Sequence, residues 1–150
     1  MSESDHRWMQ RALELAAHAE SIGEVPVGAV IVLDDKIIGE GWNQPISSHD
    51  PTAHAEIIAL RQACSHMGNY RLPEAQIFIT LEPCIMCAGA LIHARVARCV
   101  FAAEESKTGA AGSNIDAFSI ANINHRVQCE SGLLRDESSQ LIKYFFKSRR

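Results

Sequence analysis

Residues 76–91, QIFITLEPCIMCAGAL, join a short apolar segment to the beginning of a helix. Residues 76–80 have the length and composition of a buried strand. Pro83 then breaks the chain and, because proline fits the first turn of a helix, introduces a helix through Met86, Ala90 and Leu91. This step from strand to helix is typical of α/β folds.

The same alternation continues on both sides of this stretch. Asp5 is the expected cap of the first helix and Gly23 its expected stop, and Asp34-Asp35 supplies the turn of a hairpin. The other predicted elements, in chain order, are helix 8–19, strands 27–33 and 36–41, helix 52–66, strand 98–103, strand 126–130 and helix 134–147. We therefore expect an α/β fold, a three-layer α/β/α sandwich around a mixed sheet of about five strands, formed by residues 1–150 as one domain.

The composition is that of a cytoplasmic protein with one core. Of its 150 residues 47% are hydrophobic, yet no run reaches the roughly 18 apolar residues of a membrane span. The polar start at residues 1–5 is unlike a secretory signal peptide. A net charge of −4 argues against a protein that coats nucleic acid non-specifically.

A local basic surface is still compatible with that charge. Residues 143–150 place Lys143, Lys147, Arg149 and Arg150 around Tyr144, Phe145 and Phe146. Basic and aromatic side chains together are typical of RNA contacts, and an amphipathic terminal helix with a solvated basic face is the alternative.

Five cysteines in a chain without an export signal favour reduced thiols or metal ligands over disulfides. Only Cys84 and Cys87 form a close pair. Cys64, Cys99 and Cys129 lie in apolar segments, and we expect them to be buried free thiols.

The cysteine pair and His54 form a candidate zinc site. Cys84 and Cys87 are three residues apart, so they share one face of a helix, and His54 stands near the predicted start of another. Three protein ligands leave a fourth position for water, which is typical of catalytic zinc. A structural zinc site, or none, is the alternative.

Glu56 is the candidate general base. It lies two residues after His54, and near the first turn of a helix both side chains can enter one pocket, whereas mid-helix they would diverge. This role requires the helix to begin close to His54. A carboxylate that does not bind the metal can take a proton from water and return it to the substrate.

At these residues the chain resembles the zinc-dependent cytidine and deoxycytidylate deaminase superfamily, whose signature is His-x-Glu with Pro-Cys-x-x-Cys. It is most similar to the branch of bacterial tRNA-specific adenosine deaminases. The stretches that carry this second resemblance are VPVGA at 25–29, GWN at 41–43, HDPTAHAE at 49–56, TLEPCIMCAGA at 80–90 and KTGAAGS at 107–113.

The resemblance implies a cytidine-deaminase-like fold, one Zn²⁺ per chain and a homodimer. It implies hydrolytic deamination of adenosine to inosine at the wobble position of a tRNA anticodon loop by zinc-activated water, with Glu56 protonating N1 of the base. It also implies a set of residues that contact the flipped base or its flanking nucleotides: Asn43, Ala55, Pro83 with the backbone at Cys84, Glu105, Phe145, Phe146, Arg149 and Arg150. Glu105 departs from the family pattern, because an Asp is usual at this place near the target ribose.

Two other functions are compatible with the metal ligands. A deaminase of free cytosine, guanine or a deoxynucleotide would use the same zinc core, and only residues 107–113 and the terminal helix favour tRNA. A non-enzymatic zinc-stabilised RNA-binding subunit is the second alternative, but it has no use for an unligated Glu56 beside the metal.

Overall fold

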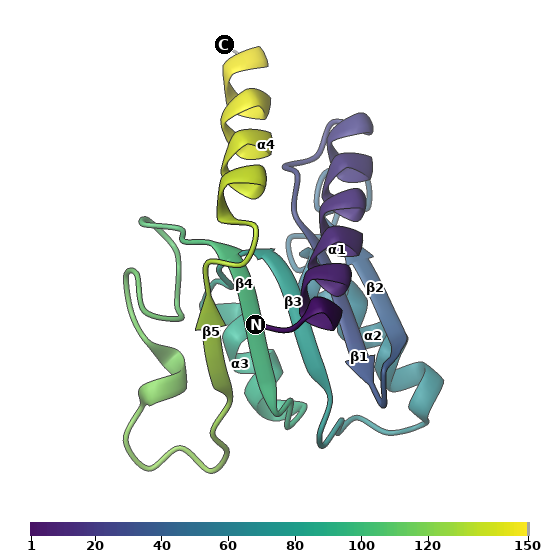
Figure 1. The fold of residues 1–150 in the computed structure, drawn as a ribbon, viewed down its shortest axis with the longest axis vertical. Coiled ribbons are helices and arrows are strands. Elements are labelled where there is room, and N and C mark those ends of the chain that lie inside the picture. The colour runs from purple at the N-terminus through teal and green to yellow at the C-terminus, as the bar shows by residue number, and fades with distance from the viewer. Residues whose placement is uncertain (150) are drawn as a thin grey trace.

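The computed structural model describes residues 1–149 and contains one mixed sheet of five strands in the order β2-β1-β3-β4-β5 (Figure 1). Neighbours β2, β1 and β3 pair antiparallel, whereas β3, β4 and β5 pair parallel. The strands are β1 Gly28–Leu33, β2 Lys36–Trp42, β3 Gln76–Leu81, β4 Arg98–Ala103 and β5 Gln128–Ser131. The predicted mixed five-stranded α/β architecture is confirmed.

Helices cover both faces of this sheet, so the molecule has three layers. Figure 1 shows α1 (Glu3–Ser21) and α4 (Arg135–Ser148) on the near face, with α2 (Ala55–Met67) and α3 (Ile85–His93) on the far face. Two separate apolar clusters correspond to these layers. Met9, Ala12 and Leu15 of α1 pack on one face of the strands, and alanines of α2 with Leu91 of α3 pack on the other.

The first helix begins earlier than the sequence predicts. Its N-cap is Ser2, whose hydroxyl accepts from the Asp5 N–H at 3.1 Å while the Asp5 carboxylate accepts from the Ser2 N–H at 3.2 Å. Asp5 therefore closes a capping box from inside the helix and is not the cap. Gly23, with φ of 84°, ends the segment as expected.

The hairpin between β1 and β2 follows the prediction. Asp34 and Asp35 have φ angles of 51° and 60°, the left-handed pair that a two-residue type I′ turn requires. Glycines of β2 then face α2 at very short range. A Cβ on Gly41 would lie 2.2 Å from the Ala55 carbonyl oxygen, so the helix backbone rests directly on the strand.

The start of α2 differs from the predicted one in a way that matters for the site, whereas α3 begins just after Pro83, as predicted. The Asp50 carboxylate accepts from the N–H of Thr52 at 2.8 Å and from its hydroxyl at 2.7 Å, and this turn delays α2 until Ala55. His54 becomes the N-cap of α2, and Cys84 takes the same position on α3. As predicted, α2 ends before Gly68, which adopts φ of 64°.

The segment between β4 and β5 contains one element that the sequence analysis did not predict, a single 3₁₀ turn at Ala117–Ser119. Beyond β5, α4 begins at Arg135 and extends past the sheet (Figure 1). The buried Ser138 hydroxyl donates to the Thr80 carbonyl oxygen, which fastens the first turn of α4 to β3. Arg150 lies outside the described residues.

Within residues 1–149, no helix combines the length and apolar character needed to cross a membrane. All five cysteines are free. Of the three expected to be buried thiols, Cys99 is buried, whereas Cys64 and Cys129 are only partly buried.

We expect Gly41→Ala to destabilise the protein by about 1–3 kcal/mol, because its methyl group would overlap the backbone of α2. Gly89→Ala is the matched control: a Cβ there meets no atom within 4 Å, and alanine in a helix should add about 0.5–1 kcal/mol. Urea denaturation of both variants measures the difference. Equal stabilities would contradict the close contact of α2 with β2.

Candidate metal centre and active site

The candidate site lies at one edge of the sheet. β2 and β3 run in the same direction, since both are antiparallel to β1, and β4 is parallel to β3. Their carboxyl ends therefore meet at this edge, where Asn43 follows β2 and Glu82 follows β3. The N-termini of α2 and α3 contribute the remaining side chains. Ligand sites commonly form at such strand ends in α/β proteins.

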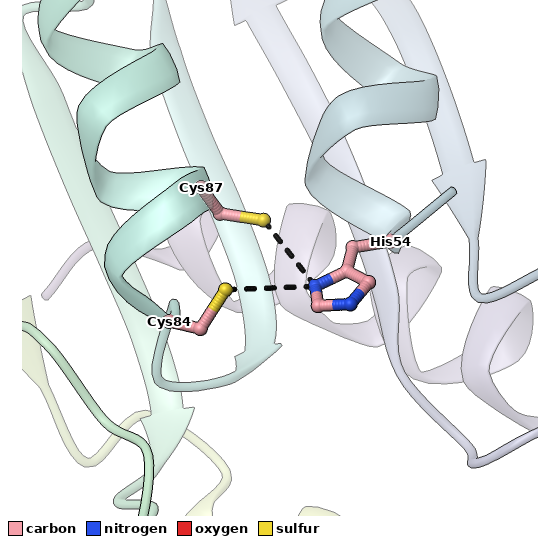
Figure 2. Close-up of side chains that lie close together, drawn as sticks. All are labelled: His54, Cys84 and Cys87. Atoms are coloured by element: carbon pink, nitrogen blue, oxygen red, sulfur yellow. Dashed lines mark hydrogen bonds between the residues drawn. The ribbon is translucent and has the colours of Figure 1, made fainter. Parts of the chain in front are cut away.

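Three predicted metal ligands converge here from two helix starts (Figure 2). His54 Nδ1 lies 3.6 Å from Cys84 Sγ and 3.6 Å from Cys87 Sγ. Tetrahedral zinc, with bonds of about 2.0–2.1 Å to nitrogen and 2.3 Å to sulfur, separates such atoms by about 3.6 Å. His54 Nδ1 therefore lies at the spacing expected in a zinc site from both sulfurs, and all three donor atoms lie within 4.8 Å of one another.

The electrostatics favour negative charge on sulfur. The hydrogen bond from the Cys87 thiol, supported by His54, lowers the pKa of Cys84 to about 4. The same contact, together with burial, raises the pKa of Cys87, so the first proton leaves from Cys84. Both helix N-termini add partial positive charge nearby. Thiolate is the form of cysteine that binds metal ions.

Glu56 lies in the first turn of α2, as its predicted role requires. Its side chain is only 4% exposed and lines the same cavity as His54 and Cys84. Burial raises the pKa of Glu56 to about 7. A carboxyl group with a pKa near neutrality can both accept and donate a proton.

Asn43 is tied to the start of α2. Its Oδ1 accepts a hydrogen bond from the Ala55 N–H at 2.9 Å, so the first free N–H of the helix is used by this side chain. Asn43 also lines the cavity that His54 and Glu56 line. Because the Ala55 N–H is already bonded to Asn43, the side chain of Asn43 is the group of this pair that remains for a base.

The cavity itself has a volume of about 130 Å³. Its polar wall holds Asn43, His54 and Glu56, and its apolar wall holds Val25, Val27 and Leu81. The lining offers apolar contact for a ring and a few polar groups that can fix its orientation.

Two other residues that were predicted to contact the substrate accept hydrogen bonds from backbone N–H groups of the loop at 107–113. Pro83 is buried, and its carbonyl oxygen accepts from the Ala110 N–H at 2.8 Å. The Glu105 carboxylate accepts from the Lys107 N–H at 2.9 Å. Neither side chain lines the 130 Å³ cavity.

The residues of α4 that were predicted to contact RNA differ in burial. Phe145 is only 5% exposed and lies under the Arg149 guanidinium, 4.3 Å from the ring centroid. This differs from the predicted surface role, because the ring packs inside the protein and supports Arg149. Phe146 is 48% exposed. Phe146 and Ile142 line a groove of about 800 Å³. Four basic side chains complete its lining: Lys107, Lys143, Lys147 and Arg149.

Glu82 and Thr108 also line the cavity, and the sequence did not single them out. Glu82 stands beside the metal-ligand motif, and a charged residue between an apolar strand and a proline is the one available signal. Thr108 belongs to residues 107–113, which the sequence analysis gives only as a stretch that carries the family resemblance.

A family model for MafB19-like deaminases matches residues 3–150 of this chain. A tRNA-specific adenosine deaminase of Haemophilus influenzae is 53% identical over 150 residues, covering 99% of this chain and 87% of that protein. A second tRNA-specific adenosine deaminase, from Agrobacterium fabrum, is 41% identical and matches 100% of this chain and 98% of its own length.

Solved structures share the fold closely. A structure from work on A-to-I editing by tRNA:A34 deaminases at the wobble position of transfer RNA superposes with a TM-score of 0.88 and 41% identity, covering 90% of this chain and 98% of that chain. Guanine deaminase from Bacillus subtilis gives a TM-score of 0.67 and 41% identity, over 79% of this chain and 74% of that one.

We expect Cys84→Ala to be purified with little zinc, because two remaining ligands hold the ion far more weakly than three. Cys64→Ala should retain the zinc content of the unmodified protein, since Cys64 lies outside this group. Elemental analysis of both proteins after gel filtration tests this. Equal zinc in the two variants would show that the metal is held elsewhere.

Proposed function

We propose that this chain, which belongs to the MafB19-like deaminase family and to its tRNA-specific adenosine deaminases, hydrolytically deaminates adenosine to inosine at the wobble position of a tRNA anticodon. Water replaces the 6-amino group, so adenosine and water yield inosine and ammonia. The observation that carries the proposal is the buried Glu56 in one cavity with His54 and Cys84.

His54, Cys84 and Cys87 would hold one zinc ion per chain. Bound there, zinc supplies a Lewis acid that activates a water molecule. The 3.6 Å separations between His54 Nδ1 and each sulfur support this assignment. Three ligands leave room for that water, which a closed four-ligand structural site would not.

Glu56 moves the protons of the reaction. Its pKa of about 7 lets the carboxylate accept a proton from water at neutral pH and deliver it to N1 of the ring. The carboxylate then takes the second proton, from the new hydroxyl on C6, and delivers it to the departing amine. Because the side chain is buried, few water molecules compete for that proton. Glu56 thus begins and ends each turnover in the same protonation state.

Asn43 orients the base. Its Oδ1 is held by the Ala55 N–H, which directs the amide nitrogen toward the cavity as a donor to the ring. Ala55 therefore acts on the substrate through Asn43. Val25, Val27 and Leu81 offer apolar contact to the ring faces.

The basic groove beside α4 is the proposed path for the anticodon loop. Lys107, Lys143 and Lys147 attract phosphates, while Phe146 offers an exposed ring for base stacking. The target base must leave its stack, which costs least in a single-stranded loop. The groove is local, since the whole chain carries a net charge of −4. Glu105, at the start of the adjoining loop, and Arg149 are assigned to the flanking nucleotides.

We further expect residues 1–150 to act as one domain, in the cytoplasm and as a homodimer. These expectations rest on the resemblance to the tRNA-specific adenosine deaminases and on the processing of tRNA in that compartment.

The zinc-bound protein should convert adenosine to inosine in an isolated anticodon stem-loop, a hairpin that exposes its loop bases. Mass spectrometry of the digested RNA measures the inosine. Guanine is the control substrate, because the guanine deaminase of Bacillus subtilis shares this fold. Release of ammonia from guanine with no inosine in the RNA would replace the proposed substrate by a free base.

Glu56→Gln should lower kcat by about 10²–10⁴-fold, the range for loss of general acid–base catalysis, and should leave zinc bound. Stem-loop turnover and elemental analysis are measured on the same preparation. Glu14→Gln, an exposed exchange on α1, is the control and should retain full activity. Loss of zinc from Glu56→Gln would instead make Glu56 a ligand, and a stable, active variant would exclude it from catalysis.

A further inference from the structure

A second buried carboxylate stands beside the catalytic one. Glu82 is 3% exposed and accepts four hydrogen bonds from a single loop. Its Oε1 accepts from the Glu105 N–H at 3.0 Å and from the Ser113 hydroxyl. Its Oε2 accepts from the N–H groups of Ala111 at 2.9 Å and Ser113 at 3.1 Å. Both oxygens are thus committed to the loop at 105–113.

This loop contributes to two binding surfaces at once. Thr108 lines the catalytic cavity with His54 and Glu56, and the adjacent Lys107 lines the basic groove beside α4. The position of the loop at 105–113 therefore affects both the cavity for the reacting base and the groove proposed for the flanking nucleotides. The anchor of that segment is the Glu82 carboxylate.

Gly109 shows how closely the loop wraps around this anchor. A Cβ on Gly109 would lie 2.4 Å from Glu82 Cδ and 2.4 Å from the Glu105 carbonyl oxygen. Only a residue without a side chain fits between them. The close contact and the four hydrogen bonds together determine one loop conformation.

We propose that Glu82 is a positioning residue that holds the 105–113 loop in the conformation that accepts the nucleotides flanking the target adenosine. The inference rests on the proposed function, because it concerns the same RNA. Glu82 acts through the loop and not on the reacting atoms, since its oxygens are occupied by backbone and hydroxyl donors.

This role predicts a particular kinetic change. Without the anchor the loop populates several conformations, and RNA binds only to the competent fraction, so the apparent affinity falls in proportion to that fraction. RNA that is bound orders the loop again and reacts normally. KM should therefore rise while kcat stays nearly constant. A merely structural role would instead reduce the amount of active protein, lowering the apparent kcat at unchanged KM.

Glu82→Gln tests this in the zinc-bound protein. Glutamine keeps the size of the side chain but replaces one acceptor oxygen by a donor, which then faces N–H or O–H donors of the loop. We expect KM for the anticodon stem-loop to rise about tenfold or more, given the strength of hydrogen bonds to a charged acceptor. Zinc content and kcat should remain close to those of the unmodified protein, and hydrogen exchange at residues 105–113 should become faster.

Ser113→Ala removes the exposed hydroxyl that donates to Glu82. It should raise KM and speed up hydrogen exchange at residues 105–113 by smaller amounts than Glu82→Gln does. This second variant also tests the inference if Glu82→Gln folds poorly. Glu14→Gln is the control, because it makes the same exchange of a carboxylate for an amide on the exposed surface of α1, outside the loop. Unchanged KM and unchanged exchange in both loop variants would overturn the inference. Absence of stem-loop turnover in the unmodified protein would overturn the proposed function instead.

Discussion

The approach of α2 to β2 is the contact on which the rest of the site depends. Because Gly41 has no side chain, the carbonyl of Ala55 lies directly over the strand, and the first residue of the helix cannot shift. His54 precedes that residue, so its imidazole is fixed at the edge of the sheet. The Asn43 side chain, from the end of the same strand, then binds the Ala55 N–H and locks the junction.

Burial gives the two carboxylates of the site different tasks. Glu56 has few partners, so burial raises its pKa and makes its proton available. Glu82 is equally buried but accepts four hydrogen bonds, which retain it as a fixed acceptor. The number of donors around each carboxylate thus separates proton transfer from loop positioning.

Sequence patterns revealed what depends on local spacing. The alternation of helix and strand predicted the three layers, and Cys84 and Cys87, three residues apart, predicted two ligands on one helix start. Contacts between distant segments were not visible in this way. The bonds of Glu82 to residues 105–113 require β3 and β4 to be neighbours, and the burial of Phe145 depends on which side of α4 faces the sheet. The start of α2 was misplaced because the Asp50 turn competes with helix formation at residues 52–54.

The first turn of α4 is tied to the strand that leads to the metal ligands. The Ser138 hydroxyl joins its first turn to Thr80, only four residues before Cys84, while its far end extends past the sheet. α4 has 14 residues and is therefore about 21 Å long, so a change of about 5° in its direction would displace its far end by about 2 Å. The strand that leads to the metal ligands therefore also sets the direction in which the basic end of α4 points.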